Sequence, residues 1–254
     1  IATDSPRAIS RLTPSRMVSS PSGLVTFLPM LTAFNTGRLA VSSLCSKLLI
    51  LWVVVLYAPA VHASSQVLVL GDSLSAGYNI DVAQGWVQLL QQRLKDQGYG
   101  HSVVNASMSG ETTGGGLNRL PRALALHSPQ VVIVELGGND GMRALPLSVI
   151  HSNLEKIVEL STGAGAQVVL VGIRIPPNYG QEYGEGFYRI YAELAQSKGL
   201  FLVPFALEGI ALSEGMMQSD GIHPTASAQT RLLDNIWPAL KKALDAKEHS
   251  KTAQ

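Results

Sequence analysis

The sequence has a single cysteine, few aromatic residues, almost no net charge and no apolar run long enough to span a membrane. Because Cys45 has no second cysteine to pair with, an intramolecular disulfide and a cysteine-rich zinc site are both excluded. The net charge of +1 comes without a basic stripe or an acidic tail, which argues against a nucleic-acid partner. Aliphatic residues are abundant in the 254-residue chain, so it can still bury a sizeable core.

The first 63 residues differ from the rest and predict an N-terminal extension followed by a secretory signal peptide. Residues 1–46 are rich in Ser, Pro, Thr and Arg, and Lys47 then precedes the apolar stretch LLILWVVVLY and the small-residue exit VHA. This apolar stretch is shorter than the roughly 20 residues that a membrane span needs. We expect residues 1–29 to precede the natural start and cleavage to follow Ala63, giving a periplasmic or secreted protein without a membrane span. An uncleaved N-terminal anchor is the alternative.

From residue 64 to residue 254, apolar runs alternate with helical patterns. The expected strands are Gln66–Leu70, Ser102–Asn105, Val131–Leu136, Gln167–Ile173 and Leu200–Val203. The expected helices are 85–97, 121–127 with Pro121 in its first turn, 147–160, 186–197 and 225–246. This alternation predicts a single α/β domain in which helices cover both faces of a parallel sheet.

Small and polar residues follow the first three expected strands. Gly71-Asp72-Ser73 follows the first strand, Ser107–Gly110 the second and Gly137–Asp140 the third. Ligands of such sheets bind beyond the carboxyl ends of the strands, so these three loops are predicted to meet at one site.

Ser73 and a histidine near the C-terminus have the residue types of an activated nucleophile. A serine hydroxyl needs a neighbouring base to take its proton. Asp220, three residues before His223, can fix one ring nitrogen of the imidazole and leave the other free to accept that proton. The alternatives are structural: Ser73 as a helix N-cap and Asp220 as the cap of the last helix. Asp72 is expected to brace the turn.

Two other loops could stabilise negative charge on a carbonyl oxygen. Acyl transfer requires fixed donors, each of which contributes about 2.7–4 kcal/mol to lowering the barrier. Gly110 can offer a backbone N–H and Asn139 a side-chain amide, and a positive φ is expected at Gly138. Ordinary turn chemistry is the alternative for both loops.

The stretch GETTGGG, residues 110–116, resembles a phosphate-binding loop only superficially. It lacks the Gly-Lys-Ser/Thr ending of a P-loop, so we interpret it as a loop whose glycines let it lie close to the site.

Other side chains near these loops are candidates for the floor and walls of the site. Glu135 and Arg174 end consecutive strands, which suggests an ion pair under the floor, with solvent exposure of both as the alternative. Met142, Pro177 and Tyr179 are the candidates for lining an acyl pocket, and ordinary core positions are the alternative.

Taken together, four blocks resemble the SGNH, or GDSL, hydrolases. They are GDSLS at 71–75, the glycine of SMSGET at 110, GGND at 137–140 and DGIHP at 220–224. The longer stretches LGDSLSAGY, VVNASMSGET, VELGGNDG, IRIPPNYG and MMQSDGIHP are similar to the subfamily of periplasmic acyl-CoA thioesterase I, lysophospholipase L1 and arylesterase. The resemblance covers nearly all of residues 66–243.

This resemblance implies a flavodoxin-like three-layer α/β/α sandwich with a five-stranded parallel sheet of order 2-1-3-4-5. It implies Ser73 as nucleophile, His223 as base oriented by Asp220, and an oxyanion hole made by the N–H of Ser73, Gly110 and Asn139. No cofactor or metal is implied. The expected activity is hydrolysis of lipid-like acyl esters and thioesters by a monomer, and a carbohydrate deacetylase or a non-catalytic binding module on the same fold are the alternatives.

Overall fold

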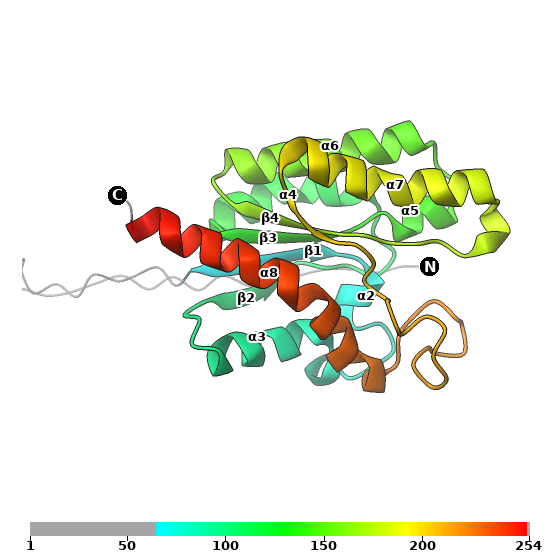
Figure 1. The fold of residues 1–254 in the computed structure, drawn as a ribbon, viewed down its shortest axis with the longest axis horizontal. Coiled ribbons are helices and arrows are strands. Elements are labelled where there is room, and N and C mark those ends of the chain that lie inside the picture. Colours follow the sequence, from blue (N-terminus) through cyan, green and yellow to red (C-terminus); the bar gives the residue numbers. More distant parts are fainter. Residues whose placement is uncertain (1–64, 253–254) are drawn as a thin grey trace, which may run out of the picture. The chain divides into compact units, whose positions relative to one another are not determined.

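The computed structural model describes residues 65–252, with side chains to residue 247 (Figure 1). The predicted signal peptide and the cleavage point after Ala63 lie outside the described residues. Within the described part of the chain, no helix is both long and apolar enough to cross a membrane.

The centre of the domain is a five-stranded parallel sheet. Its strands are β1 (Gln66–Gly71), β2 (Ser102–Asn105), β3 (Val131–Glu135), β4 (Gln167–Val171) and β5 (Phe201–Val203). They lie in the order β2-β1-β3-β4-β5, which confirms the predicted topology. The chain therefore winds one way from β1 to β2 and the other way from β3 onward, so the switch point lies between β1 and β3.

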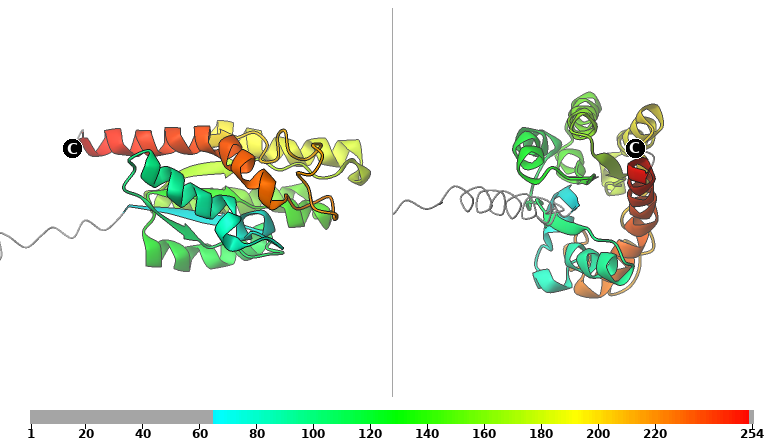
Figure 2. Two further views of the ribbon diagram at one scale, coloured as in Figure 1. Left: turned by 90° about the horizontal axis from the view of Figure 1, so that it is seen from below. Right: turned by 90° about the vertical axis from the view of Figure 1, so that its left-hand side faces the viewer.

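Helices cover both faces of this sheet (Figures 1 and 2). The α-helices are α2 (Ser73–Ala76), α3 (Trp86–Asp96), α4 (Thr113–His127), α5 (Gly138–Met142), α6 (Leu147–Gly163), α7 (Gln181–Lys198) and α8 (Gln229–Thr252). Short 3-10 turns occupy Val82–Gln84, Pro177–Tyr179 and Ala226–Ala228. The helices α3 and α8 pack on one face, and α4, α6 and α7 pack on the other.

Alternation along the strands divides the core into two layers. Val67 and Val69 of β1 face the layer that contains α3 and α8, whereas Leu68 and Leu70 face the layer that contains α4, α6 and α7. Because successive side chains of a strand point to opposite faces, a strand buried on both faces must be apolar throughout. This explains why β1, β3 and β4 appear in the sequence as uninterrupted apolar runs.

The start of α4 differs from the prediction. The helix begins at Thr113 instead of Pro121, and the segment expected to be a loop is its first turn. The Thr112 hydroxyl caps this turn by accepting from the Gly115 N–H at 3.1 Å. Glycine is a poor helix former, but a Cβ on Gly116 would overlap Leu136 Cδ1. The glycine is therefore explained by the close packing of α4 on the sheet.

We predict that Gly116→Ala lowers the free energy of unfolding by about 1–3 kcal/mol, because the added methyl group forces Leu136 or α4 to move. Gly114→Ala in the same turn is the matched control, since its Cβ would make only ordinary contacts at 3.6 Å and beyond. Urea denaturation of both variants measures the difference. Equal stability of the two would contradict this account of the packing.

Candidate active site

Ser73 lies on a tight turn at the carboxyl end of β1. Asp72 caps α2, its Oδ1 accepting from the Leu74 N–H at 3.0 Å, and Gly77 ends the helix with a φ of +73°. The expectation that Asp72 braces this turn is therefore confirmed. Ser73 itself is the first residue of α2 and not its N-cap, so its hydroxyl is left available for another partner.

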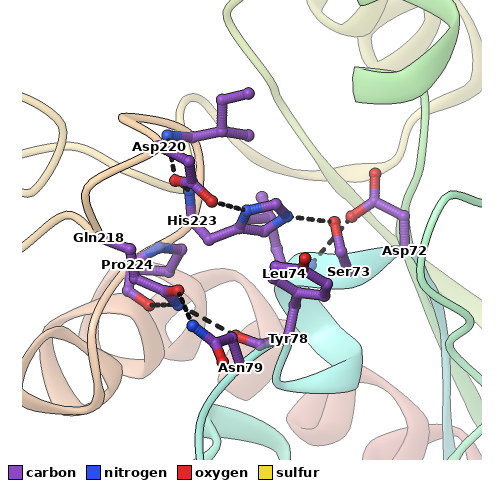
Figure 3. A network of polar contacts seen from close by, with 10 residues as sticks. Asp72, Ser73, Leu74, Tyr78, Asn79, Gln218, Asp220, His223 and Pro224 are labelled. Atoms are coloured by element: carbon purple, nitrogen blue, oxygen red, sulfur yellow. Dashed lines mark hydrogen bonds and ion pairs between the residues drawn. The ribbon is translucent and has the colours of Figure 1, made fainter.

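That partner is His223, on the loop before α8 (Figure 3). Its Nε2 is 2.9 Å from Ser73 Oγ, and its Nδ1 is 2.7 Å from Asp220 Oδ2. The second oxygen of Asp220 accepts the backbone N–H groups of Ile222 and His223, at 2.9 and 3.0 Å. These contacts join an acid, an imidazole and a hydroxyl in one line, with the hydroxyl and the imidazole 150 residues apart in the chain.

The three backbone and side-chain donors around Asp220 lower the pKa of its carboxyl to about 2. The backbone N–H of His223 contributes most to this shift, followed by its ring. The carboxylate is therefore ionised at neutral pH, and it holds Nδ1 of the imidazole as a donor and Nε2 as an acceptor.

The histidine loop is fixed by a residue that the sequence did not single out. Gln218 accepts from Asn79 Nδ2 at 3.1 Å and donates to the carbonyls of Tyr78 and Pro224 at 3.0 and 3.1 Å (Figure 3). The Tyr78 ring also lies against the His223 ring, with centroids 4.3 Å apart. Gln218 thus ties the loop that carries His223 to the segment after α2. In the sequence, Gln218 is a single glutamine in a polar turn, and this pattern does not predict its contacts.

The two side loops also reach this edge of the sheet. Gly110 has a φ of +79°, and its loop is joined to β1 by a hydrogen bond from the Met108 N–H to the Gly71 carbonyl at 3.1 Å. Asn139 Nδ2 donates to Asp72 Oδ2 at 3.1 Å and to the Glu111 carbonyl at 2.9 Å. Its amide therefore bridges the serine turn and the Gly110 loop.

The glycine with left-handed backbone in the third loop is Gly137, at φ +118°, so the expectation of a positive φ at Gly138 is wrong. Gly138 is the first residue of α5 and adopts helical backbone. A Cβ on Gly137 would meet the Tyr191 hydroxyl, which donates to the Leu136 carbonyl at 2.9 Å.

A buried aspartate fastens α5 to α4. The carboxylate of Asp140 accepts from the Thr113 N–H at 2.9 Å and from the Thr113 hydroxyl at 2.5 Å. Asn153 of α6 donates to the same hydroxyl at 3.1 Å. The segment that carries Asn139 is thereby held in a fixed place relative to the Gly110 loop, which leads into α4.

An apolar cavity of about 370 Å³ opens beside Ser73. Its walls include Met142 and Pro177, two of the three candidates named from the sequence, and their role in binding an acyl chain stays a prediction. Further wall residues come from the end of β4 and from the long loop after β5, and they include Ile173, Phe205, Leu207, Leu212 and Met217. Tyr179 does not line this cavity. Its hydroxyl donates to the Met142 carbonyl at 2.8 Å, so it supports the wall from behind.

The predicted Glu135–Arg174 ion pair is wrong. Glu135 Oε2 accepts from the Ser75 hydroxyl at 2.7 Å and from the Asp72 N–H at 3.3 Å, and no ion pair joins it to Arg174 among the described residues. The Arg174 guanidinium instead lies 3.7 Å from the centroid of the Tyr188 ring. The two side chains leave neighbouring strands but turn toward different partners.

The arrangement has the chemistry of acyl transfer. An ionised carboxylate, an imidazole and a hydroxyl are aligned, the Asn139 amide contacts the same turn, and an apolar cavity begins at the hydroxyl. Within residues 65–247, no group of three or more His, Cys, Asp or Glu side chains is placed to hold a metal ion.

Comparisons with known proteins agree with this geometry. Residues 69–231 match the model of the GDSL-like lipase/acylhydrolase family. Esterase TesA of Pseudomonas aeruginosa is 51% identical over 182 residues, which cover 72% of this chain and 90% of that protein. Thioesterase 1/protease 1/lysophospholipase L1 of Escherichia coli K12 is 43% identical over 177 residues, covering 70% of this chain and 83% of that one.

Solved structures give the same result. The esterase EstA from Pseudoalteromonas sp., in a structure inhibited by monoethylphosphonate, is 38% identical with a TM-score of 0.68. The alignment covers 71% of this chain and 99% of that one. The residues 69–231 that match the family model include the serine turn and the histidine loop, and the chain belongs to the GDSL-like lipase/acylhydrolase family.

Proposed function

We propose that the protein hydrolyses acyl esters and thioesters, including lysophospholipids, through an acyl-enzyme formed on Ser73. The observation that carries this proposal is the placement of His223, whose two ring nitrogens lie 2.7 Å from Asp220 and 2.9 Å from Ser73. Hydrogen bonds of this length on both sides of an imidazole are what a general base for a serine nucleophile requires.

In this mechanism, Ser73 Oγ attacks the acyl carbonyl carbon while His223 Nε2 takes the hydroxyl proton. The charge on the former carbonyl oxygen is stabilised by the N–H groups of Ser73 and Gly110 and by the Asn139 amide. Asn139 keeps its hydrogen bond to Asp72 and gives the oxyanion the hydrogen that it otherwise donates to the Glu111 carbonyl. His223 then gives its proton to the leaving alkoxide or thiolate. A water molecule, deprotonated by the same nitrogen, attacks the acyl carbon and releases Ser73 as the free hydroxyl.

The substrate class rests on the cavity and on the relatives. An apolar cavity beside the nucleophile suits the acyl chain of a lipid-like substrate, with Met142 and Pro177 among its walls. The relatives are named for esterase, thioesterase and lysophospholipase activities. A cavity that accepts more than a two-carbon acyl group favours these substrates over those of a carbohydrate deacetylase.

The location and assembly of the protein are part of the proposal. We infer a periplasmic or secreted protein made by removal of residues 1–63, because the apolar stretch and the small-residue exit have the form of a signal peptide. All the proposed catalytic groups come from one chain, which is sufficient for a monomer.

We expect Ser73→Ala to abolish hydrolysis of p-nitrophenyl esters while circular dichroism remains unchanged, since the hydroxyl is the bond-forming group. A fluorophosphonate should label the wild-type protein at Ser73, as found by peptide mass spectrometry. Ser152→Ala, on α6, is the control and should retain both labelling and turnover. Substantial hydrolysis by Ser73→Ala would rule out the assignment, and a folded wild type that neither labels nor turns over would favour a binding module.

Asp220→Asn should lower kcat by about 10⁴-fold, the effect known for the corresponding change in a serine protease, because an amide favours the wrong imidazole tautomer. KM should change little, since Asp220 does not line the acyl cavity. Stopped-assay kinetics on one thioester and one oxygen ester measure both constants. A loss of less than about tenfold would show that the carboxylate does not orient His223.

Ala211→Trp should shift the acyl-chain preference toward shorter chains, because Ala211 lines the cavity and the indole adds bulk there. Turnover of acetyl esters should stay the same, and Ala211→Ser, which preserves the size of the side chain, should keep the wild-type profile. A series of p-nitrophenyl esters and acyl-CoA thioesters of increasing chain length tests this. An unchanged profile in Ala211→Trp would place the acyl chain elsewhere.

A further inference from the structure

Two buried acids lie beneath the serine turn, and the mechanism above uses neither of them directly. Asp72 is 3% exposed and Glu135 is 1% exposed. They come together because β1 and β3 pair in parallel with Gly71 opposite Glu135, which places the carboxyl end of β3 under the residue that precedes Ser73.

Every donor that these acids contact is neutral. Glu135 Oε2 accepts from the Ser75 hydroxyl and the Asp72 N–H. Asp72 accepts from the Leu74 N–H through Oδ1 and from the Asn139 amide through Oδ2. The contact of the Asp72 N–H with Glu135 Oε2 at 3.3 Å makes the two buried acids direct neighbours.

If Asp72 and Glu135 were both ionised, no lysine or arginine of the described residues would neutralise them. In the described part of the chain, neither carboxyl group has an ion pair with lysine or arginine. The titratable groups that face the pair are His223, on the Asp72 side, and Asp140 and Tyr191, on the side of β3 and α7. Two adjacent buried carboxylates repel each other and lose hydration, so they cannot both ionise in the way that exposed ones do.

One carboxyl oxygen of the Asp72–Glu135 pair indicates which of the two groups is protonated. Glu135 Oε1 is buried and has no hydrogen-bond partner among the described residues. An unpartnered buried acceptor is costly, but a proton on Glu135 converts the carboxylate into a donor, and Asp72, whose N–H contacts Glu135 Oε2 at 3.3 Å, carries the neighbouring carboxylate that could accept. Burial raises the pKa of Glu135 well above its usual value and that of Asp72 to about 6, which agrees with this direction.

We propose that Glu135 is a positioning residue which stays protonated at neutral pH and donates to ionised Asp72, so that Asp72 holds both the serine turn and the Asn139 amide. The inference rests on the proposed function for its effect on catalysis. Asp72 Oδ2 fixes one hydrogen of the amide that would stabilise the oxyanion, and Asp72 Oδ1 fixes the first turn of α2. Ionisation of Glu135 would repel Asp72 from both contacts.

The position of the proton is tested without any activity measurement. Infrared spectra of the wild-type protein at neutral pH should contain the carbonyl band of a buried protonated carboxylic acid. Incorporation of ¹³C-glutamate should shift this band, and incorporation of ¹³C-aspartate should leave it in place. Absence of the band, or a band that moves only with labelled aspartate, would overturn the proposal whether or not the protein hydrolyses esters.

The catalytic effect is tested by two substitutions at one position. Glu135→Gln keeps a donor for Asp72 and an acceptor for Ser75, so kcat at neutral pH should stay near the wild-type value. Glu135→Leu keeps the volume but neither polar function, and kcat should fall by at least about tenfold, bounded by the roughly 10²–10³-fold cost of losing one oxyanion donor. KM should change little in both.

The pH dependence separates positioning from a merely structural role. Wild-type kcat should decline at alkaline pH as Glu135 loses its proton, and Glu135→Gln should lack this decline. The raised pKa also means that the native state holds the proton more tightly than the unfolded state. The free energy of unfolding of the wild type should therefore fall as pH rises through the native pKa of Glu135, and this fall should be absent in Glu135→Gln. Identical pH profiles of kcat in the two proteins would refute the positioning role.

Discussion

The parallel pairing of Gly71 with Glu135 is the contact on which the geometry of the site depends. A Cβ on Gly71 would lie 2.7 Å from Ser75 Oγ and 2.9 Å from Glu135 Oε2. The missing side chain therefore lets β1 turn into α2 directly above a buried carboxyl group. The Glu135 oxygen accepts from both the Asp72 N–H and the Ser75 hydroxyl, and so holds the turn from either side of Ser73.

The rest of the site is attached to this turn by contacts between loops that are distant in sequence. Asn139 reaches the turn through Asp72, and Asp140 secures the same segment to α4 through Thr113. The histidine loop is fastened separately, by Gln218. A reacting carbonyl must meet a nucleophile, a base and oxyanion donors within a few tenths of an ångström, so each loop needs its own polar anchor to the sheet edge.

The sequence predicted the sheet well because buried parallel strands are apolar throughout and therefore easy to recognise. It predicted the loops that meet at the site because parallel topology brings the carboxyl ends of strands together. It failed at the start of α4, where three consecutive glycines indicate a loop, since local propensity does not include the close packing of Gly116 on Leu136.

The sequence also could not predict the direction in which particular side chains point. Glu135 and Arg174 leave adjacent strands, which made an ion pair plausible, yet one points under the serine turn and the other stacks on Tyr188. The role of Gln218 depends on a loop conformation that only the folded chain defines. Contacts of this kind arise from tertiary structure, and no local pattern of residue types encodes them.

The carboxylates around Ser73 differ in environment, and the difference follows from what each must do. Asp220 is partly solvent-exposed and receives hydrogen bonds from two backbone N–H groups and the His223 ring, which hold its pKa at about 2 and keep it charged beside the imidazole that becomes a cation. Asp72 and Glu135 are buried beside the Asn139 amide, which the proposed mechanism directs at the oxyanion, and there each additional negative charge would oppose the reaction. A protonated Glu135 limits that pair to one negative charge instead of two, so less negative charge opposes the oxyanion while ionised Asp220 still stabilises positive charge on His223.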